Sequence, residues 1–497
     1  MPQVSDSRTP SIWLDTAEVP SFAPLTEDMS VDVAVVGGGL VGVVSAYLLV
    51  KSGLSVGLFE GRRILHGVSG NTTAKVSASH GMIYEHLRSQ FNEGKAQLYA
   101  EANMQAIDWI EEHARDAHFR RKDLVLYGED DKTWEALHKE GEAARAAGIP
   151  CDLQEKLSVP FPTHGGLVFP NMAEFHPVKF AVPLLQDAVA AQCKVFENTM
   201  LSEVDEHETT TLKTLDGHSI RARDVVIATH FPFFDPAFYY ARLDAFRDYA
   251  IAVEMPDCLP QMYVGAGEGY TYRCEGDLLI VSGGAHKVGK NPDTEKQYSD
   301  MEQFVRDHFG LSKVRHRWSS QDNSSLDKVP YIGKISADAE HVWVACGFGG
   351  WGMTTSIVAA QLLTSLIRGQ NPAEADLYSP LRFKPLASAP TLGTILADSV
   401  RGLVGKRLFG GSDTEPEEMK PGQAEVVSTK EGKVGAFCDE QGVVHAVSAV
   451  CTHMGCILAW NNAERSWDCP CHGSRFDHEG KVLHGPAVSP LKKVEVD

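Results

Sequence analysis

The sequence predicts a protein of the α/β class that carries a second, α+β domain and a small all-β domain at its C-terminus. One observation is a strand–turn–helix–strand unit at residues 31–60, in which a glycine-rich turn follows an apolar strand. A second is a group of cysteines and histidines crowded into residues 451–472. The third is the stretch 410–422, whose Gly, Pro and acidic residues lack an apolar pattern and indicate a linker.

The strand–turn–helix–strand unit has the composition of a nucleotide-binding element. Residues 31–36 are almost continuously apolar, as expected of a strand buried on both faces of a parallel sheet. Residues 40–51 predict a helix that ends before Gly53, and residues 55–59 predict the next strand. The turn between strand and helix fits the pattern G-x-G-x-x-G. Together these elements predict a Rossmann-like domain that binds a dinucleotide.

The turn and the end of the second strand supply the chemistry for that ligand. Glycines let the backbone approach a pyrophosphate, and the N-terminus of the helix stabilises its negative charge. Glu60 stands where an acid binds the ribose hydroxyls of adenosine, and its carboxylate would repel the 2′-phosphate of NADP. The predicted residues of this part of the site are Gly37, Gly39, Leu40, Gly42 and Glu60.

Length and charge set outer limits on the function. With 497 residues the chain is expected to hold two to four domains. Its net charge of −20 argues against a nucleic-acid partner and against an anionic membrane surface. Because no signal pattern and no long uninterrupted apolar run occur, we expect a cytoplasmic protein without stable membrane insertion. Six singly scattered cysteines are expected to be reduced or buried thiols: Cys151, Cys193, Cys258, Cys274, Cys346 and Cys438.

A small, hydroxyl-rich segment follows Glu60 and reads G-V-S-G-N-T-T-A-K. A single dinucleotide motif that ends in Glu and is followed by S-G-N-T resembles the FAD-dependent D-amino-acid-oxidase-like family, which includes sarcosine and glycine oxidases. The resemblance implies FAD as cofactor, with Ser69, Asn71 and Thr72 lying along the flavin. In relatives that attach flavin covalently, a histidine follows S-G-x-T-x, whereas this chain has Ala74, which implies non-covalent FAD.

Later segments extend the same resemblance to about residue 385. Residues 224–229 resemble the strand that re-enters the FAD domain, and residues 327–333 resemble the D-x-x-P-x-I-G return. A glycine-rich segment then opens the predicted helix 357–367, and backbone N–H groups at such a helix start can stabilise negative charge on a flavin. The predicted residues here are Gly347, Gly350, Gly352, Met353 and Thr354.

The cysteine–histidine group fits a metal cluster. The pattern is Cys451-x-His453, then fifteen residues, then Cys469-x-x-His472. This is the ligand set of a Rieske [2Fe–2S] centre. The two thiolates would hold one iron and the two imidazoles the other. Two Cys and two His also suit zinc, but zinc does not explain the flanking C-T-H-x-G-C and C-P-C-H-G-S.

The residues around these ligands resemble the respiratory Rieske proteins. By that resemblance Cys456 and Cys471 form a disulfide between the two ligand loops. Ser474 matches a residue that hydrogen-bonds the cluster, and Phe476 replaces the usual Tyr, which implies a lower reduction potential. Residues 485–487 resemble the proline loop that covers the cluster.

These resemblances predict how the chain divides into domains. The FAD-binding domain is discontinuous, and a helical insertion at about 92–148 interrupts its first part. The expected segments are an N-terminal arm (1–30), the FAD domain (31–230 and 323–390), a substrate domain (231–322), an amphipathic helix and linker (391–422) and the Rieske domain (423–497).

The combined prediction is a two-cofactor oxidoreductase. It oxidises an amine or amino-acid-like substrate at a C–N bond and passes electrons singly from FAD to the cluster, then to a one-electron acceptor protein or small molecule. Lys75 and His80 are the catalytic candidates, because they are the ionisable side chains between Ser69 and Met82.

Three other functions stay open. A reductase relaying electrons from NADH would normally carry a second dinucleotide motif. A Rieske oxygenase would need a mononuclear iron site, and the spacing of Asp108, His113 and His118 fits that site poorly. A non-catalytic electron-transfer or assembly protein is the third alternative.

Overall fold

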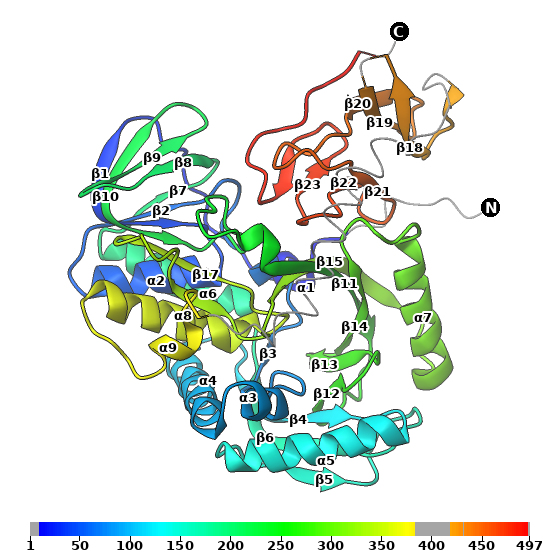
Figure 1. Ribbon diagram of the computed structural model, residues 1–497. Helices are drawn as coiled ribbons and strands as arrows, with labels where there is room; N and C mark the ends of the chain where they lie inside the picture. Colours follow the sequence, from blue (N-terminus) through cyan, green and yellow to red (C-terminus); the bar gives the residue numbers. More distant parts are fainter. Residues whose placement is uncertain (1–8, 383–417, 431, 496–497) are drawn as a thin grey trace.

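The computed structural model describes residues 9–382, 418–430 and 432–495. They form two domains built on large sheets and a smaller C-terminal domain that lies against both (Figure 1). The amphipathic helix expected at residues 391–408 lies outside the described residues. Among the helices that the structure does describe, none is both long enough and apolar enough to cross a membrane.

The first domain is an eight-stranded sheet with a parallel centre. Its main order is β16-β17-β10-β1-β2-β7, and the hairpin β8–β9 pairs with β10. Along β1, Val33 and Val35 face one hydrophobic cluster while Ala34 and Val36 face another, so both faces are covered. The strands are β1 (Met29–Val36), β2 (Val56–Phe59), β7 (Lys194–Phe196), β8 (Leu201–Asp205), β9 (Thr210–Thr214), β10 (Ser219–Ile227), β16 (Tyr331–Lys334) and β17 (Val342–Cys346). Helices α2 (Leu40–Lys51), α6 (Pro177–Ala190) and α8 (Gly352–Ile367) pack together in this domain.

The second domain is a nine-stranded sheet with its own helices. The main strand order is β15-β11-β14-β13-β12-β4-β6-β3, and β5 pairs with β6. The strands are β3 (Lys75–Val76), β4 (Arg120–Tyr127), β5 (Asp152–Gln154), β6 (Gly166–Glu174), β11 (Leu243–Glu254), β12 (Met262–Gly265), β13 (Thr271–Glu275), β14 (Leu278–Lys287) and β15 (Val314–Ser325). The helices in these and the following segments are α3 (Tyr84–Gln90), α4 (Glu93–His113), α5 (Asp131–Ala146), α7 (Glu295–Phe309) and α9 (Ala375–Tyr378).

This sheet takes strands from two stretches of the chain, residues 75–174 and 243–325. The sequence predicted a substrate domain at 231–322 and a helical insertion at about 92–148. The structure differs because β4 lies between α4 and α5 and pairs with β6 and β12. Its first three residues are basic, so its apolar pattern is confined to four buried residues at its end.

The small C-terminal domain consists of two antiparallel sheets. One contains β18 (Ala424–Thr429), β19 (Gly432–Cys438) and β20 (Val444–Ser448). The other contains β21 (Ala459–Asn461), β22 (Ser466–Asp468), β23 (Arg475–Asp477) and β24 (Val482–His484). The predicted fold class, α/β with an α+β domain and a small all-β domain, is confirmed.

The N-terminal segment is anchored instead of simply lying on the surface. Helix α1 (Ile12–Asp15) carries Trp13, whose side chain is fully buried. The indole Nε1 donates a hydrogen bond to the carbonyl of Thr72, 2.6 Å away. The arm therefore supports the segment that the sequence predicts to lie along the flavin.

One pair of cysteines differs from the expectation of single thiols. Cys258 and Cys274 lie in neighbouring parts of the second domain, with their Sγ atoms 1.94 Å apart. A separation of 16 residues along the chain does not by itself indicate that two cysteines pair. The fold of the segment between them brings the two side chains together.

The C-terminal domain contacts both larger domains through polar groups. Arg62 of the first domain donates from Nη1 to the carbonyl of Leu483 at 2.6 Å. From the second domain, Gln321 Nε2 donates to the carbonyl of Gly473 at 2.9 Å, and the Arg247 guanidinium lies 3.0 Å from the Glu464 carboxylate. Contacts on two sides fix how this domain is docked.

Candidate functional site

A cavity of about 210 Å³ opens at the carboxyl ends of β1 and β2. Gly37, Gly39 and Leu40 line it, as the dinucleotide motif predicts, whereas Gly42 stands behind the turn. A Cβ atom on Gly42 would lie 1.8 Å from the carbonyl oxygen of Gly37, so the helix can approach the turn only with glycine there. The cradle of backbone that a pyrophosphate needs is therefore present.

Glu60 lies at the end of β2 and lines the same cavity. Its carboxylate accepts hydrogen bonds from the backbone N–H groups of Gly38, at 2.7 Å, and Arg62, at 2.8 Å. Burial raises the pKa of this carboxyl, although the two backbone hydrogen bonds oppose that shift. The acid is thus held in a fixed orientation beside the glycine turn, as a ribose-binding acid requires.

The hydroxyl-rich segment contributes one side chain directly to the cavity. Ser69 lines it, and its Oγ accepts a hydrogen bond from the Leu40 N–H at 2.8 Å. The side chains of Asn71 and Thr72 instead bond within their own segment. Asn71 donates to the carbonyl of Gly67 at 2.8 Å, and Thr72 Oγ1 accepts from the Ala74 N–H at 3.0 Å. Their observed side-chain role is to shape the loop.

The glycine-rich segment before α8 also divides into lining and supporting residues. Gly352 and Met353 line the cavity, and α8 begins at Gly352 without a side-chain cap at its N-terminus. Gly347 and Gly350 lie in the turn before the helix, where Gly350 donates its N–H to Asp322 at 2.7 Å. Thr354 is buried, and its Oγ1 donates to the carbonyl of Ser77 at 3.0 Å.

Lys75 and His80 are buried outside the described lining of this cavity. Lys75 Nζ donates to Thr271 Oγ1 at 2.8 Å, and burial lowers the pKa of this amine to about 7, with the charge of Arg273 adding to the shift. The His80 ring stacks on Trp351, and burial lowers the pKa of His80 to about 4. Both groups stand behind the predicted cofactor segments.

Polar residues from different domains also line the cavity, beyond the set predicted from the sequence. His230 follows β10, and its Nε2 lies 3.4 Å from the Asp322 carboxylate. Its Nδ1 lies 3.1 Å from Nε2 of His484, a residue of the C-terminal domain. The sequence signal for His230 was its position directly after a parallel strand. Its contact with His484 could not be predicted, because it forms only when the C-terminal domain docks.

The loop that follows β24 forms part of the cavity wall. Residues 482–488 of the C-terminal domain line the same space as the glycine turn. This loop includes residues 485–487, which resemble the proline loop that covers a Rieske cluster. Ala487 donates its N–H to Ser474 Oγ at 3.0 Å, so the loop contacts the cluster-binding region and the cavity together.

The four predicted metal ligands come together in the loops between the strands of the C-terminal domain. Cys451 and Cys469 are buried, and the rings of His453 and His472 lie 5.1 Å apart. Within the described residues, neither ring nitrogen of the buried His472 has a hydrogen-bond partner, and neither does Nδ1 of His453. Buried imidazole nitrogens without partners are unfavourable unless a ligand such as a metal satisfies them, so the residues fit the cluster.

The protonation of these side chains also suits metal binding. A hydrogen bond from the Cys469 thiol lowers the pKa of Cys451 to about 7. Burial lowers the pKa of His453 to about 4 and that of His472 to about 3. Metal ligation requires thiolates and neutral imidazoles, and the shifts favour these forms for Cys451, His453 and His472. The hydrogen bond to Cys451 and burial instead raise the pKa of Cys469, so this thiol has to lose its proton when it binds iron.

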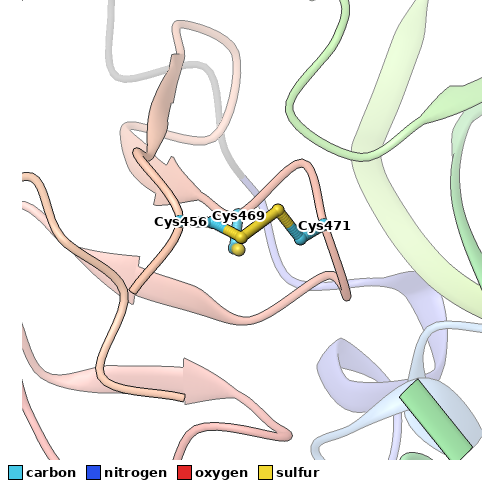
Figure 2. A group of neighbouring side chains, drawn as sticks. All are labelled: Cys456, Cys469 and Cys471. Atoms are coloured by element: carbon cyan, nitrogen blue, oxygen red, sulfur yellow. A yellow bond between two sulfur atoms is a disulfide. The ribbon is translucent and has the colours of Figure 1, made fainter. Parts of the chain in front are cut away.

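A further pair of cysteines lies beside the ligands. Figure 2 shows the Sγ atoms of Cys456 and Cys471 joined, 2.15 Å apart, with Cys469 next to them. Phe476 is fully buried in the same hydrophobic cluster as these cysteines. The pairing connects the two loops that carry the predicted ligands.

Comparisons with known proteins agree with both halves of this arrangement. Residues 32–366 match the DAO family model, described as FAD dependent oxidoreductase, and residues 412–495 match the Rieske [2Fe-2S] domain model. The chain is 36% identical to YhfW of Bacillus subtilis (strain 168), whose name describes a Rieske 2Fe-2S iron-sulfur protein, over 98% of this chain and 97% of that one.

Solved structures share the fold of the larger part. Glycine oxidase from Geobacillus kaustophilus superposes with a TM-score of 0.61 and 17% sequence identity. The match covers 71% of this chain and 99% of that chain. L-amino acid deaminase from Proteus vulgaris superposes with a TM-score of 0.61 and 16% sequence identity. The match covers 76% of this chain and 100% of that one. The two matched family models show that the cofactors are FAD and a Rieske [2Fe–2S] cluster. The chain belongs to the DAO family of FAD dependent oxidoreductases and carries a Rieske domain at its C-terminus.

Proposed function

We propose that this oxidoreductase oxidises an amine or amino-acid-like substrate at a C–N bond, with FAD supplying two-electron chemistry and the Rieske cluster supplying one-electron transfer to an external acceptor. The observation that carries the proposal is the shared cavity: residues 482–488 of the Rieske domain and residues 37–41 of the FAD domain line the same space. Tethering within one chain gives the two centres an effective concentration of roughly millimolar. The docking contacts then fix their approach.

The described residues support distinct roles in holding FAD. Gly37, Gly39 and Leu40 offer backbone to the pyrophosphate, and Glu60 accepts hydrogen bonds from the ribose. Ser69 and the uncapped start of α8, at Gly352 and Met353, line the remainder of the cavity. The remaining predicted residues support these walls: Gly42, Asn71, Thr72, Gly347, Gly350 and Thr354.

The Rieske domain supplies the proposed cluster site. Cys451 and Cys469 would bind one iron through sulfur, and His453 and His472 the other through nitrogen. The proposed Cys456–Cys471 disulfide holds the two ligand loops together. The amino-acid-like substrate remains a proposal drawn from the solved structures of similar fold, whose names include a glycine oxidase and an amino acid deaminase.

Anaerobic rapid mixing tests the order of electron flow. Mixed with a panel of secondary amines, tertiary amines and amino acids, the full-length protein should lose flavin absorbance first and show a reduced cluster second. The Cys469→Ala variant should still lose flavin absorbance but reduce an external one-electron acceptor at least about tenfold more slowly. NADH serves as the comparison substrate. Bleaching by NADH alone, or cluster reduction before the flavin, would contradict the proposal.

FAD should be bound without a covalent link. The position that would carry an attachment histidine is Ala74, which is fully buried and has no nucleophilic side chain. After acid precipitation, the yellow flavin should therefore appear entirely in the supernatant. Flavin that sediments with the denatured protein would contradict this expectation.

Lys75 should give the stability of the protein a distinctive pH dependence. Its pKa is lowered from 10.5 to about 7 on folding, so between these values the unfolded state binds one proton more than the native state. Stability from this group therefore rises with pH across the window, by up to about 1.4 kcal/mol per pH unit. The thermal midpoint of the wild type minus that of Lys75→Met should increase between pH 7 and pH 9. Lys51→Met, at an exposed position, is the control and should show no such slope.

A further inference from the structure

A second group of metal-binding side chain types lies in the Rieske domain, apart from the four proposed iron ligands. His445 is on β20, and His478 and Glu479 are in the turn between β23 and β24. One possible ligand atom of each of these three residues lies within 4.8 Å of those of the other two. The group, which we call the histidine site, therefore joins the two sheets of this domain.

The two imidazole rings of the histidine site lie close together on an aromatic neighbour. Their centroids are 4.7 Å apart, and their planes are inclined by 78°. Phe437 of β19 lies against both rings, with centroid distances of 6.2 Å to His445 and 5.6 Å to His478. The proposed iron ligands His453 and His472 have a similar arrangement, at 5.1 Å and 89°. The two rings are thus spaced like a pair of imidazoles that share one metal ion.

A carboxylate orients one of these rings. Asp439 lies in the turn before β20, and its Oδ2 is 3.0 Å from Nε2 of His445. The other oxygen of Asp439 accepts hydrogen bonds from the backbone N–H groups of Gln441 and Val443, so the carboxylate is itself fixed. Histidines that bind metals commonly donate one ring N–H to a carboxylate, which orients the other ring nitrogen toward the metal.

Positive charges near the site compete with a cation. Glu479 pairs with Lys481 at 3.0 Å, and the charge of Lys493 also acts on this carboxylate. The Lys481 side chain is 72% exposed, and an exposed ion pair of this kind is weak, so a metal ion can displace the ammonium group. Asp439 and Asp477, which accepts a hydrogen bond from the N–H of Glu479, add two further negative charges.

We propose that the histidine site binds a divalent transition metal ion such as Zn²⁺, through one nitrogen each of His445 and His478 and a carboxylate oxygen of Glu479. Two imidazoles and a carboxylate are a ligand set that zinc uses, with water in the fourth position. Bonds of about 2.1 Å place tetrahedral ligand atoms about 3.4 Å apart, so these partly exposed side chains have to close by at most about 1.4 Å.

A metal ion at the histidine site links the β19–β20 hairpin to the turn after β23. Because the ion binds the folded domain, it stabilises the Rieske domain by linkage. This inference goes beyond the proposed function, because it needs neither substrate turnover nor electron transfer.

The test uses the full-length protein with both cofactors bound. The protein is dialysed to equilibrium against a series of Zn²⁺ concentrations, and zinc and iron are counted in each sample by atomic spectroscopy. One zinc ion per chain should bind saturably, while the iron content and the Rieske absorption stay unchanged. Zinc at about 100 times its Kd should slow backbone hydrogen exchange in residues 439–445 and 477–481 by up to about 100-fold.

Matched variants assign the bound ion to these side chains. His478→Gln and Glu479→Gln each remove a ligand and should weaken zinc binding at least about tenfold. Lys481→Gln removes the competing ammonium group and should tighten zinc binding. His207→Gln is the control: Nε2 of His207 also lies beside a carboxylate, 3.2 Å from Asp205, but the described residues place no third ligand near this pair. Zinc binding should therefore be unchanged in this variant.

The zinc content of the variants decides the proposal. Saturable binding of one zinc ion per chain that is weakened in His478→Gln and kept in His207→Gln supports the histidine site. Absence of saturable binding, or equal binding by the wild type and His478→Gln, overturns the proposal. Zinc that binds only as iron is lost also overturns it, because the ion then occupies the iron site. Unchanged flavin and Rieske absorbance before zinc is added checks that each variant is folded.

Discussion

Replacing Cys469 by alanine is expected to remove the [2Fe–2S] cluster completely while FAD stays bound. The proposed ligand set has two thiolates for one iron, and loss of either leaves that iron without a complete set. The glycine turn and Glu60 belong to a different sheet from the ligand loops, so the flavin should remain. Iron content should fall from two atoms to nearly none per chain, and the Rieske absorption and electron paramagnetic resonance signals should disappear.

Cys438→Ala is the matched control for this experiment. Cys438 is as buried as Cys469, at 1% exposure each, and lies in the same domain but on β19, away from the ligand loops. This variant should keep its iron and its spectrum. A cluster that survives in Cys469→Ala would refute the ligand assignment, and a cluster lost equally in both variants would point to general unfolding.

Substituting alanine for Gly42 is expected to abolish tight FAD binding. The added Cβ would lie 1.8 Å from the carbonyl oxygen of Gly37, so either α2 or the glycine turn has to move. Displacement of about 1 Å in a binding site costs on the order of 100-fold in its function. Flavin content after purification and the Kd measured by flavin fluorescence should both show the loss.

Gly217→Ala separates this effect from general destabilisation. Gly217 has a φ of +90° in a turn between β9 and β10, and a Cβ atom there meets nothing within 4 Å. The variant should lose about 1 kcal/mol of stability through backbone strain yet retain FAD. Equal flavin loss in both variants would show that Gly42 is not specific to the cavity.

Local sequence patterns were sufficient where ligands are close neighbours along the chain. The buried strand, the glycine turn and Glu60 span 30 residues, and their geometry follows from one strand–helix–strand unit. The cluster ligands likewise occupy two short loops. Patterns could not decide whether Asn71 and Thr72 present side chains to the cavity, since both side chains bond within their own segment.

Features that depend on docking escaped prediction. His230 and His484 are separated by 254 residues, and no local pattern connects them. The same holds for Gln321 and Gly473, which lie 152 residues apart in the chain and meet between two domains. Strand β4 was missed for a different reason: its basic first half pairs in the sheet through its backbone, which side-chain hydrophobicity does not report.

The position of residues 482–488 in the chain has a consequence for biosynthesis. They form a wall of the flavin cavity, yet they are made after every other residue described as lining it. Because domains fold as the chain emerges from its N-terminus, the glycine turn, Glu60 and the start of α8 can all be in place while that wall is still missing. FAD can thus enter an open cavity before residues 482–488 are made, and the addition of this segment then closes the cavity around the bound cofactor.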